Sequence, residues 1–190
     1  MASVMFGKLP MTCYPPEFTD QVQLTQMSVT EAPGRTHTYY TGKPEFEFGD
    51  GLSYDAWSLK YSAEEGAASS NGVVFTTDAG SKNTFNVVVQ NKGTFGGRCT
   101  IIAFWRPKGH LQPLRQKMFG FDGVQVGSGG SASLRFELTA EHLAVADVDG
   151  HQIVIEGDYE VFFKGAGVGE LLHVPVTVTG SPRTVTAFGH

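Results

Sequence analysis

Two carboxylates at positions i and i+2, Asp147 and Asp149, are the pair in this sequence that most resembles part of a cation-binding loop. A calcium loop requires about six or more oxygen ligands, and the residues around this pair do not supply them. Gly150 follows directly, and Asp-Gly is a common turn dipeptide because both residues tolerate tight backbone geometry. We therefore expect a turn at this position and no metal site.

Other candidate catalytic or ligating residues lack the spacing that their chemistry needs. Ser53, Ser58 and Ser62 have no nucleophile-elbow context. The glycine-rich segment 127–130 lies between expected strands, so it predicts a hairpin and not a phosphate-binding loop. The histidines are scattered, and none pairs with another at a four-residue spacing beside a third ligand: His37, His110, His142, His151, His173 and His190. We expect no catalytic residue and no cofactor.

The tryptophans and cysteines each admit two interpretations. Trp57 and Trp105 could form a stacking platform for a sugar, but both lie in apolar stretches, so core packing is favoured. Cys13 and Cys99 are far apart in the sequence and have no metal-site spacing. We favour two free thiols, with a disulfide between them as the alternative.

The composition indicates a turn-rich β protein. The chain has 190 residues, of which 41% are hydrophobic and only 17% charged, with 24 glycines and 9 prolines. Its net charge of −5 does not provide the basic surface that nucleic-acid binding needs. No apolar run reaches the roughly 18 residues of a membrane span. We expect neither a nucleic-acid partner nor membrane insertion.

Three parts are expected along the chain. Residues 1–52 contain five of the prolines and seven aromatics without sustained periodicity, which predicts an extended but ordered N-terminal arm. Residues 53–182 contain alternating apolar runs separated by Gly, Asn, Ser and Asp clusters. Residues 183–190 form a C-terminal tail.

The middle part predicts an all-β fold of the immunoglobulin or fibronectin type III kind. About seven short strands are separated by turn signals, as in an antiparallel β-sandwich. Alternation places one side of each strand inward. The residues expected to be buried are Phe85, Val87, Val89, Ile102, Phe104, Phe136, Leu138, Tyr159, Val161, Val174 and Val176.

Several motifs resemble the C-terminal fibronectin type III-like domain of glycoside hydrolase family 3, the β-glucosidases and β-xylosidases. Residues 33–44 (PGRTHTYYTGKP) and 48–54 (FGDGLSY) resemble the entry to that domain. Residues 89–93, 113–121 and 148–159 resemble its later turns and hairpins in the same order. Upstream, residues 7–15 and 20–27 resemble the last strand of the preceding α/β sandwich domain and the linker that follows it.

The resemblance implies a chain without the family's catalytic machinery. In that family the nucleophilic aspartate lies in an N-terminal barrel and the acid/base carboxylate lies earlier in the α/β sandwich domain, and neither region is matched here. We therefore expect no enzyme activity but a non-catalytic structural or protein-interaction module. The alternatives are a carbohydrate-binding module, or an accessory fragment of a glycosidase whose catalytic domains are on another chain.

The arm is the expected contact surface. The strand from Lys8 to Tyr14 would lack the sheet that it completes in the family, and unpaired strands invite a partner. We expect a protein partner or self-association through residues 1–30, whereas the alternative is that these residues wrap onto the same sandwich. The side chains expected to make the contact are Phe6, Leu9, Met11, Tyr14 and Phe18.

The location depends on whether Met1 is the natural start. The N-terminal residues show no secretory signal pattern, and no asparagine begins an Asn-x-Ser/Thr glycosylation site. If Met1 is the natural start, we expect an intracellular protein. If the chain is a fragment of a glycosidase, we expect a secreted one.

Overall fold

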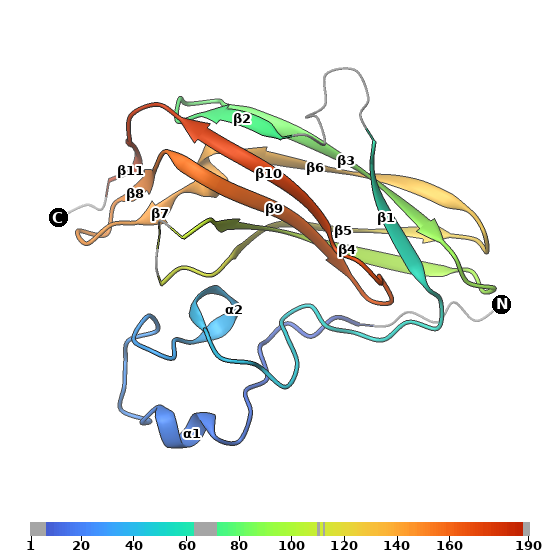
Figure 1. Ribbon diagram of the computed structural model, residues 1–190, viewed down its shortest axis with the longest axis horizontal. Helices are drawn as coiled ribbons and strands as arrows, with labels where there is room; N and C mark the ends of the chain where they lie inside the picture. Colours follow the sequence, from blue (N-terminus) through green and yellow to red (C-terminus); the bar gives the residue numbers. More distant parts are fainter. Residues whose placement is uncertain (1–6, 63–71, 110, 112, 188–190) are drawn as a thin grey trace.

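The computed structural model describes residues 7–62, 72–109, 111 and 113–187. Two β-sheets pack face to face over these residues, and the N-terminal arm lies against the outer face of one of them (Figure 1). This arrangement is the predicted all-β sandwich with an N-terminal arm.

The smaller sheet of the sandwich has the strand order β1-β3-β6. Its strands are β1 (Trp57–Ser62), β3 (Lys82–Asn91) and β6 (Ser131–Thr139), and every pairing in it is antiparallel. Strand β3 alternates between buried and half-buried residues along its length. One face of this sheet therefore supplies half of the core.

The larger sheet has the order β2-β10-β9-β4-β5. It contains β2 (Val73–Thr76), β10 (Leu172–Thr179), β9 (Gly157–Gly165), β4 (Gly97–Pro107) and β5 (Lys117–Val126). The pairing of β2 with β10 is parallel, so the sandwich is not antiparallel throughout as expected. A parallel pair is possible here because the long connection between the two strands lets β2 approach β10 in the same direction.

The main core lies between the two sheets and contains nine of the eleven predicted residues, all except Ile102 and Phe104. Each of the eleven side chains expected to be buried is at most 5% exposed. Trp57 and Trp105 are also buried, which agrees with the core packing favoured for them. Period-2 alternation therefore identified the inward side of these strands correctly except in β4, where the expected residues Ile102 and Phe104 lie on the outer face.

Ile102 and Phe104 are buried for a different reason from the rest. Their neighbours Ile101, Ala103 and Trp105 face the main core, whereas Ile102 and Phe104 form a second cluster with Phe162. Strand β4 is thus covered on both faces. A strand buried on both faces is uniformly apolar and does not alternate, which explains the composition of this stretch.

A third, small sheet closes one end of the sandwich. It has the order β11-β8-β7, from β11 (Arg183–Thr186), β8 (Gln152–Val154) and β7 (Val145–Ala146), and it follows a 3-10 turn, η1 (Ala140–Leu143). Residues 183–186 were expected to belong to a tail. They instead form β11, because β8 offers unpaired backbone groups with which they form an antiparallel ladder.

The arm is more ordered than an extended segment. It contains two single-turn helices, α1 (Phe18–Gln21) and α2 (Thr36–Tyr39), which lie below the larger sheet in Figure 1. They were not predicted, because a single turn is too short to show helical periodicity. None of the helices in the described part of the chain is long and apolar enough to cross a membrane.

Candidate functional site

The expected contact strand of the arm has backbone partners within the arm itself. Leu9 N–H donates to the carbonyl of Asp50 at 2.9 Å, and Cys13 N–H donates to the carbonyl of Phe46 at 2.9 Å. The return bonds run from Gly49 to Leu9 and from Glu45 to Cys13. The expectation of an unpaired strand from Lys8 to Tyr14 was therefore wrong, because the later part of the arm turns back and satisfies its backbone groups.

Two of the predicted contact residues form an aromatic cluster inside the arm. Tyr14 and Phe18 stack with their ring centroids 4.0 Å apart, and both meet the buried Tyr40 edge-on at 4.9 and 5.5 Å. The Tyr14 hydroxyl also accepts a hydrogen bond from the backbone N–H of Thr36 at 2.6 Å. These rings join the start of the arm to its later half.

The remaining predicted contact residues have different positions. Leu9 is half-buried beside the pairing with residues 49–50, whereas the Met11 side chain is 57% exposed. Phe6 lies outside the described residues. The structure therefore brings Tyr14 and Phe18 together and leaves Met11 on the surface.

The second half of the arm packs on the outer face of the larger sheet. The His37 ring stacks on Phe48 at 4.3 Å, and Phe48 meets Phe104 of β4 edge-on at 6.1 Å. Phe104 in turn stacks on Phe162 of β9 at 5.2 Å. Partial burial lowers the pKa of His37 because the charged form loses solvation.

Ion pairs connect the arm to the same sheet. Lys164 of β9 lies 2.8 Å from Glu47 and 2.6 Å from Asp50, both in the arm. Arg115 donates its backbone N–H to the carbonyl of Thr38 at 2.8 Å and a side-chain N–H to the carbonyl of Tyr40 at 2.9 Å. Residues 36–50 are therefore held to the sandwich by both apolar and polar contacts.

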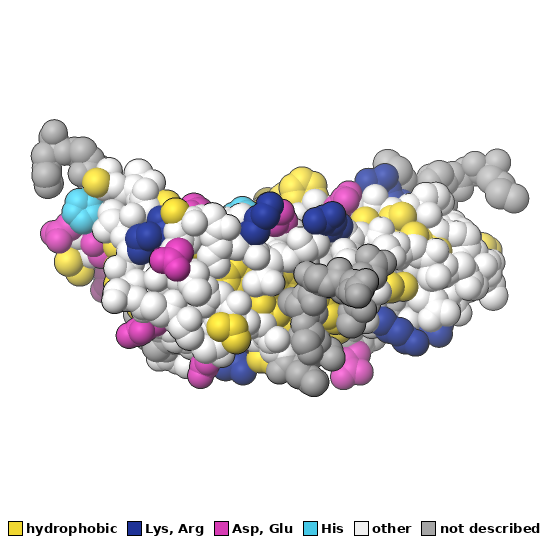
Figure 2. Space-filling model, turned by 90° about the horizontal axis from the view of Figure 1, so that it is seen from above, with side chains coloured by type: hydrophobic (Ala, Val, Ile, Leu, Met, Phe, Trp, Pro, Cys, Tyr) yellow, Lys and Arg dark blue, Asp and Glu magenta, His cyan; other side chains and the backbone are white. Residues whose placement is uncertain are grey.

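Apolar side chains remain exposed on the arm, and we call them the arm surface. Met11 and Phe46 lie on two neighbouring segments that pair at Cys13 and Phe46, and Leu24 and Met27 lie in the loop after α1. The arm surface consists of these four side chains. On the opposite side of the molecule, Figure 2 shows acidic and basic side chains interspersed, and the described residues of that face form no continuous basic patch.

The Asp147–Asp149 pair lies in a turn, as expected. One carboxylate oxygen of Asp147 accepts the backbone N–H groups of Asp149 and His151 at 3.0 and 2.8 Å. Oxygen and nitrogen atoms of these three side chains lie within 4.8 Å of one another. Because the Asp147 carboxylate already serves to close the turn, the proximity of the three groups has a structural explanation.

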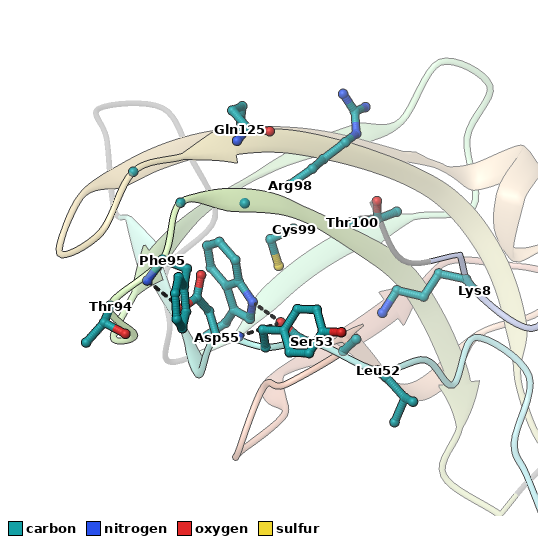
Figure 3. Close-up of a pocket in the computed structure, with 16 residues that line it drawn as sticks. Lys8, Leu52, Ser53, Asp55, Thr94, Phe95, Arg98, Cys99, Thr100 and Gln125 are labelled. Atoms are coloured by element: carbon teal, nitrogen blue, oxygen red, sulfur yellow. Dashed lines mark hydrogen bonds between the residues drawn. The ribbon is translucent and has the colours of Figure 1, made fainter. Parts of the chain in front are cut away.

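A hollow of about 820 Å³ opens at the end of the sandwich where β1 begins and β4 begins. Its apolar lining includes Leu52, Tyr54 and Phe95, which are all exposed, and one side of the buried Trp57. Figure 3 shows Leu52, Ser53 and Phe95 around this hollow, with Lys8 approaching from the arm. The hollow is far larger than the small cleft lined by His37 and Phe48 beside the arm.

The loop that carries Phe95 is held by a buried polar network. One Asp55 oxygen accepts the Phe95 N–H at 3.0 Å, and the other accepts the Asn91 side-chain N–H at 3.2 Å. Asn91 also donates to the Phe95 carbonyl at 2.7 Å. Both the N–H and the carbonyl of Phe95 are therefore hydrogen-bonded, and its side chain lines the hollow.

Two titratable groups at the hollow are perturbed by burial. Burial raises the pKa of the Cys99 thiol to about 11, and burial also lowers the pKa of Lys8. The Lys8 ammonium is buried and meets no hydrogen-bond acceptor among the described residues. Cys13 and Cys99 are both free thiols, as favoured from the sequence.

The exposed aromatics of the hollow were missed from the sequence. Phe95 lies in the segment 93–97 (GTFGG), and Tyr54 lies just before the first strand. An aromatic flanked by glycines lies outside any alternating run, so its position could have indicated exposure. No pattern in the sequence around Tyr54 or Phe95 indicates that their rings line the same hollow.

Comparison with known proteins agrees with this fold. The family model for the fibronectin type III-like domain matches residues 103–166, which include the last part of β4 and all of β5, β6 and β9. Over 190 aligned residues the chain is 31% identical to probable β-D-xylosidase 7 of Arabidopsis thaliana, with 87% of this chain and 24% of that protein covered. The chain is thus similar to the C-terminal fibronectin type III-like region of family 3 β-xylosidases.

Further proteins show a similar relationship to the chain. Beta-xylosidase/alpha-L-arabinofuranosidase 1 of Medicago sativa is 28% identical, over 88% of this chain and 24% of its own length. A family 3 exo-β-xylosidase (XlnD), solved with a xylobiose aziridine probe, superposes with a TM-score of 0.78 over 97% of this chain at 23% identity. A β-glucosidase from Listeria innocua superposes with a TM-score of 0.59 at 18% identity, which shows a shared fold alone.

The chain spans about a quarter of the length of these family 3 relatives. The match is confined to their fibronectin type III-like part, and no catalytic domain of the family is evident in the chain. Nearly the whole chain is matched in the XlnD structure, so the arm and the sandwich are both part of the shared architecture.

Proposed function

We propose that the chain is a non-catalytic module that docks through its arm surface onto the remaining part of a family 3 glycosidase. The observation that supports the proposal most directly is the arm itself. It is fastened to the sandwich by Lys164 and Arg115, yet it exposes Met11 and Phe46 on its outer side. A rigid segment with exposed apolar side chains is suited to protein contact, because little conformational entropy is lost on binding.

The proposal that the chain does not catalyse hydrolysis is supported by the chemistry that the reaction needs. Glycoside hydrolysis needs two carboxyl groups about 5–10 Å apart on either side of a sugar. Asp55, the carboxylate that lines the hollow, is occupied by Phe95 and Asn91. The module is proposed to contribute stability and position to its partner and not to bring reacting groups.

The docking can be tested with a defined partner. The part of Arabidopsis β-D-xylosidase 7 outside the matched region would be produced separately and mixed with this chain. We expect a complex in sedimentation velocity and a higher melting temperature of the xylosidase part. The chain alone should not hydrolyse an aryl-xyloside.

Matched variants separate docking from folding. Met11→Glu and Phe46→Glu place a charge on the arm surface and should weaken the complex by about tenfold or more, as for central apolar contacts. Val74→Glu is the control, because Val74 is exposed on β2, away from the arm (Figure 1). If the two arm variants bind as well as the Val74 variant, or if the chain alone hydrolyses the aryl-xyloside, the proposal is wrong.

A further inference from the structure

The hollow at the end of the sandwich has the size and lining of a small-molecule site. Its volume of about 820 Å³ lies within the usual range for ligand sites. Such sites are mainly apolar with a few convergent polar groups, and they often include residues of perturbed pKa. Leu52, Tyr54 and Phe95 supply the apolar part, while Lys8 and Cys99 supply the perturbed groups.

We propose that this hollow binds a saccharide, with a pyranose ring against the exposed aromatic side chains and a sugar oxygen as the acceptor for Lys8. This proposal concerns a surface different from the arm surface and does not depend on docking. It assigns a ligand class to residues that the sequence alone did not single out.

The aromatic rings are the first argument for a sugar. Phe95 is 65% exposed and Tyr54 is 72% exposed, although both lie at a concave site. The face of an aromatic ring is electron-rich and apolar, so it suits the C–H face of a pyranose ring, whose hydroxyls then point sideways to polar groups. Thr94 and the Ser53 hydroxyl line the hollow and can form hydrogen bonds with those hydroxyls.

The rigidity of the Phe95 loop is the second argument. The Phe95 N–H and carbonyl are bound by Asp55 and Asn91, so the ring is held in place before any ligand arrives. Trp57 is likewise fixed, because its indole N–H donates to Ser53 Oγ at 2.8 Å. A preorganised wall lowers the entropy lost on binding.

Lys8 is the third argument, and it indicates which saccharides should bind best. Its ammonium is buried without an acceptor among the described residues, which is unfavourable for a charged group. The stem of the side chain lines the hollow and has four rotatable bonds, so the ammonium can turn to a ligand there. The other cation in the lining, Arg98, points away from Ser53 and Phe95 in Figure 3. A saccharide that carries a carboxylate should therefore bind more tightly than a neutral one.

The experiment compares a neutral with an acidic saccharide on the full chain. Calorimetric titrations would use xylotetraose and a xylotriose that carries one glucuronic acid. We expect saturable binding of both and a lower Kd for the acidic probe. Trp57 forms part of the wall, so tryptophan fluorescence should change with the same dependence on ligand concentration.

Three variants assign the binding to the hollow. Phe95→Ala should weaken binding of both saccharides by about tenfold, the value of one lost ring contact. Phe121→Ala is the matched control, because Phe121 is 69% exposed on β5 and does not line the hollow. Lys8→Met keeps the stem but not the charge, so it should remove the preference for the acidic probe.

Distinct outcomes would overturn the inference. Absence of saturable binding for both saccharides would do so, as would equal effects of Phe95→Ala and Phe121→Ala. If neither saccharide binds and Phe95→Ala instead weakens the complex with the xylosidase part, the occupant of the hollow is a polypeptide and the saccharide assignment is wrong. Docking through the arm surface is tested separately, with Met11→Glu and Phe46→Glu. The docking proposal and the saccharide proposal can therefore fail independently.

Discussion

The Lys164 ammonium on β9 lies 2.6 Å from a carboxylate oxygen of Asp50 in the arm. The Lys164 side chain is only 15% exposed, and it also pairs with Glu47. An ion pair at this depth differs from a surface pair, because removal of the cation leaves the partly buried Asp50 carboxylate without this counter-charge, while Glu47 retains only the longer pair with Arg115 at 3.6 Å.

Replacement of this lysine should therefore loosen the arm. We expect Lys164→Met to lower the free energy of unfolding by about 1–3 kcal/mol, measured by urea denaturation. The control is Lys82→Met, which breaks the exposed pair with Glu137 and should change stability by less than about 0.5 kcal/mol. Equal effects of the two substitutions would show that the arm is not held by Lys164.

Acidification should weaken the contact between the arm and the sheet through His37. Burial lowers the pKa of His37 in the folded state, so the unfolded chain binds the proton more tightly. The stability from neutral His37 is therefore fully present above the unfolded pKa of about 6.5 and is lost as the pH falls below it. Glu47 and Arg115 line the same small cleft.

The measurement for His37 is the melting temperature between pH 7.5 and 5.5. The wild-type chain should lose stability over this interval. His37→Phe retains a ring to stack on Phe48 and cannot be protonated, so it should show a smaller loss. A variant with the same pH dependence as the wild type would assign the effect to another group.

Removal of the first part of the arm should reduce stability. Without residues 1–30, Tyr40 loses its contacts with Tyr14 and Phe18, and residues 45–50 lose their backbone partners. We expect the melting temperature to fall by about 5–10 °C, which corresponds to about 2–3 kcal/mol in a chain of this size. Calorimetry of the truncated chain measures the shift.

A double substitution tests the same cluster without truncation. Tyr14→Ala with Phe18→Ala should produce a large part of that shift, whereas Leu24→Ala should produce none, because the Leu24 side chain is fully exposed. If truncation leaves the melting temperature unchanged, residues 1–30 contribute to partner contact alone, as the sequence suggested.

The two cysteines should differ in reactivity. The Cys99 thiol is buried, and its pKa is raised to about 11, so little thiolate exists at pH 8. Cys13 is only half-buried. A thiol-specific disulfide reagent should therefore modify one site quickly in the native chain and both sites after unfolding, without prior reduction. The fast site should disappear in Cys13→Ser, and a fast site that persists in this variant would contradict the prediction.

The strands and their inward faces could be predicted because the relevant signal is local. Phe85, Val87 and Val89 alternate with polar residues, and alternate side chains of a strand point to opposite sides of the sheet whatever the rest of the chain does. The turn at Asp147 was predictable for the same reason, because its hydrogen bonds connect residues at most four positions apart.

The outer face of β4 illustrates what the local sequence cannot predict, namely which distant residues cover it. The uninterrupted apolar run from Ile101 to Trp105 indicates burial on both faces. It does not indicate that Phe48 and His37, far upstream, supply the cover over Phe104. That pairing depends on how the arm returns along the sheet.

The sequence by itself determined the class of fold, the inward side of the alternating strands β3, β6, β9 and β10, and the resemblance to the family 3 glycosidases. Only the tertiary structure decided that the arm pairs with itself and lies on the larger sheet, and that Tyr54 and Phe95 meet at one hollow. The physical reason is distance along the chain. Periodicity acts between neighbours, whereas the pairs Leu9–Asp50, Lys164–Asp50 and Phe95–Asp55 each join residues about 40 or more positions apart, and packing of the whole chain selects them.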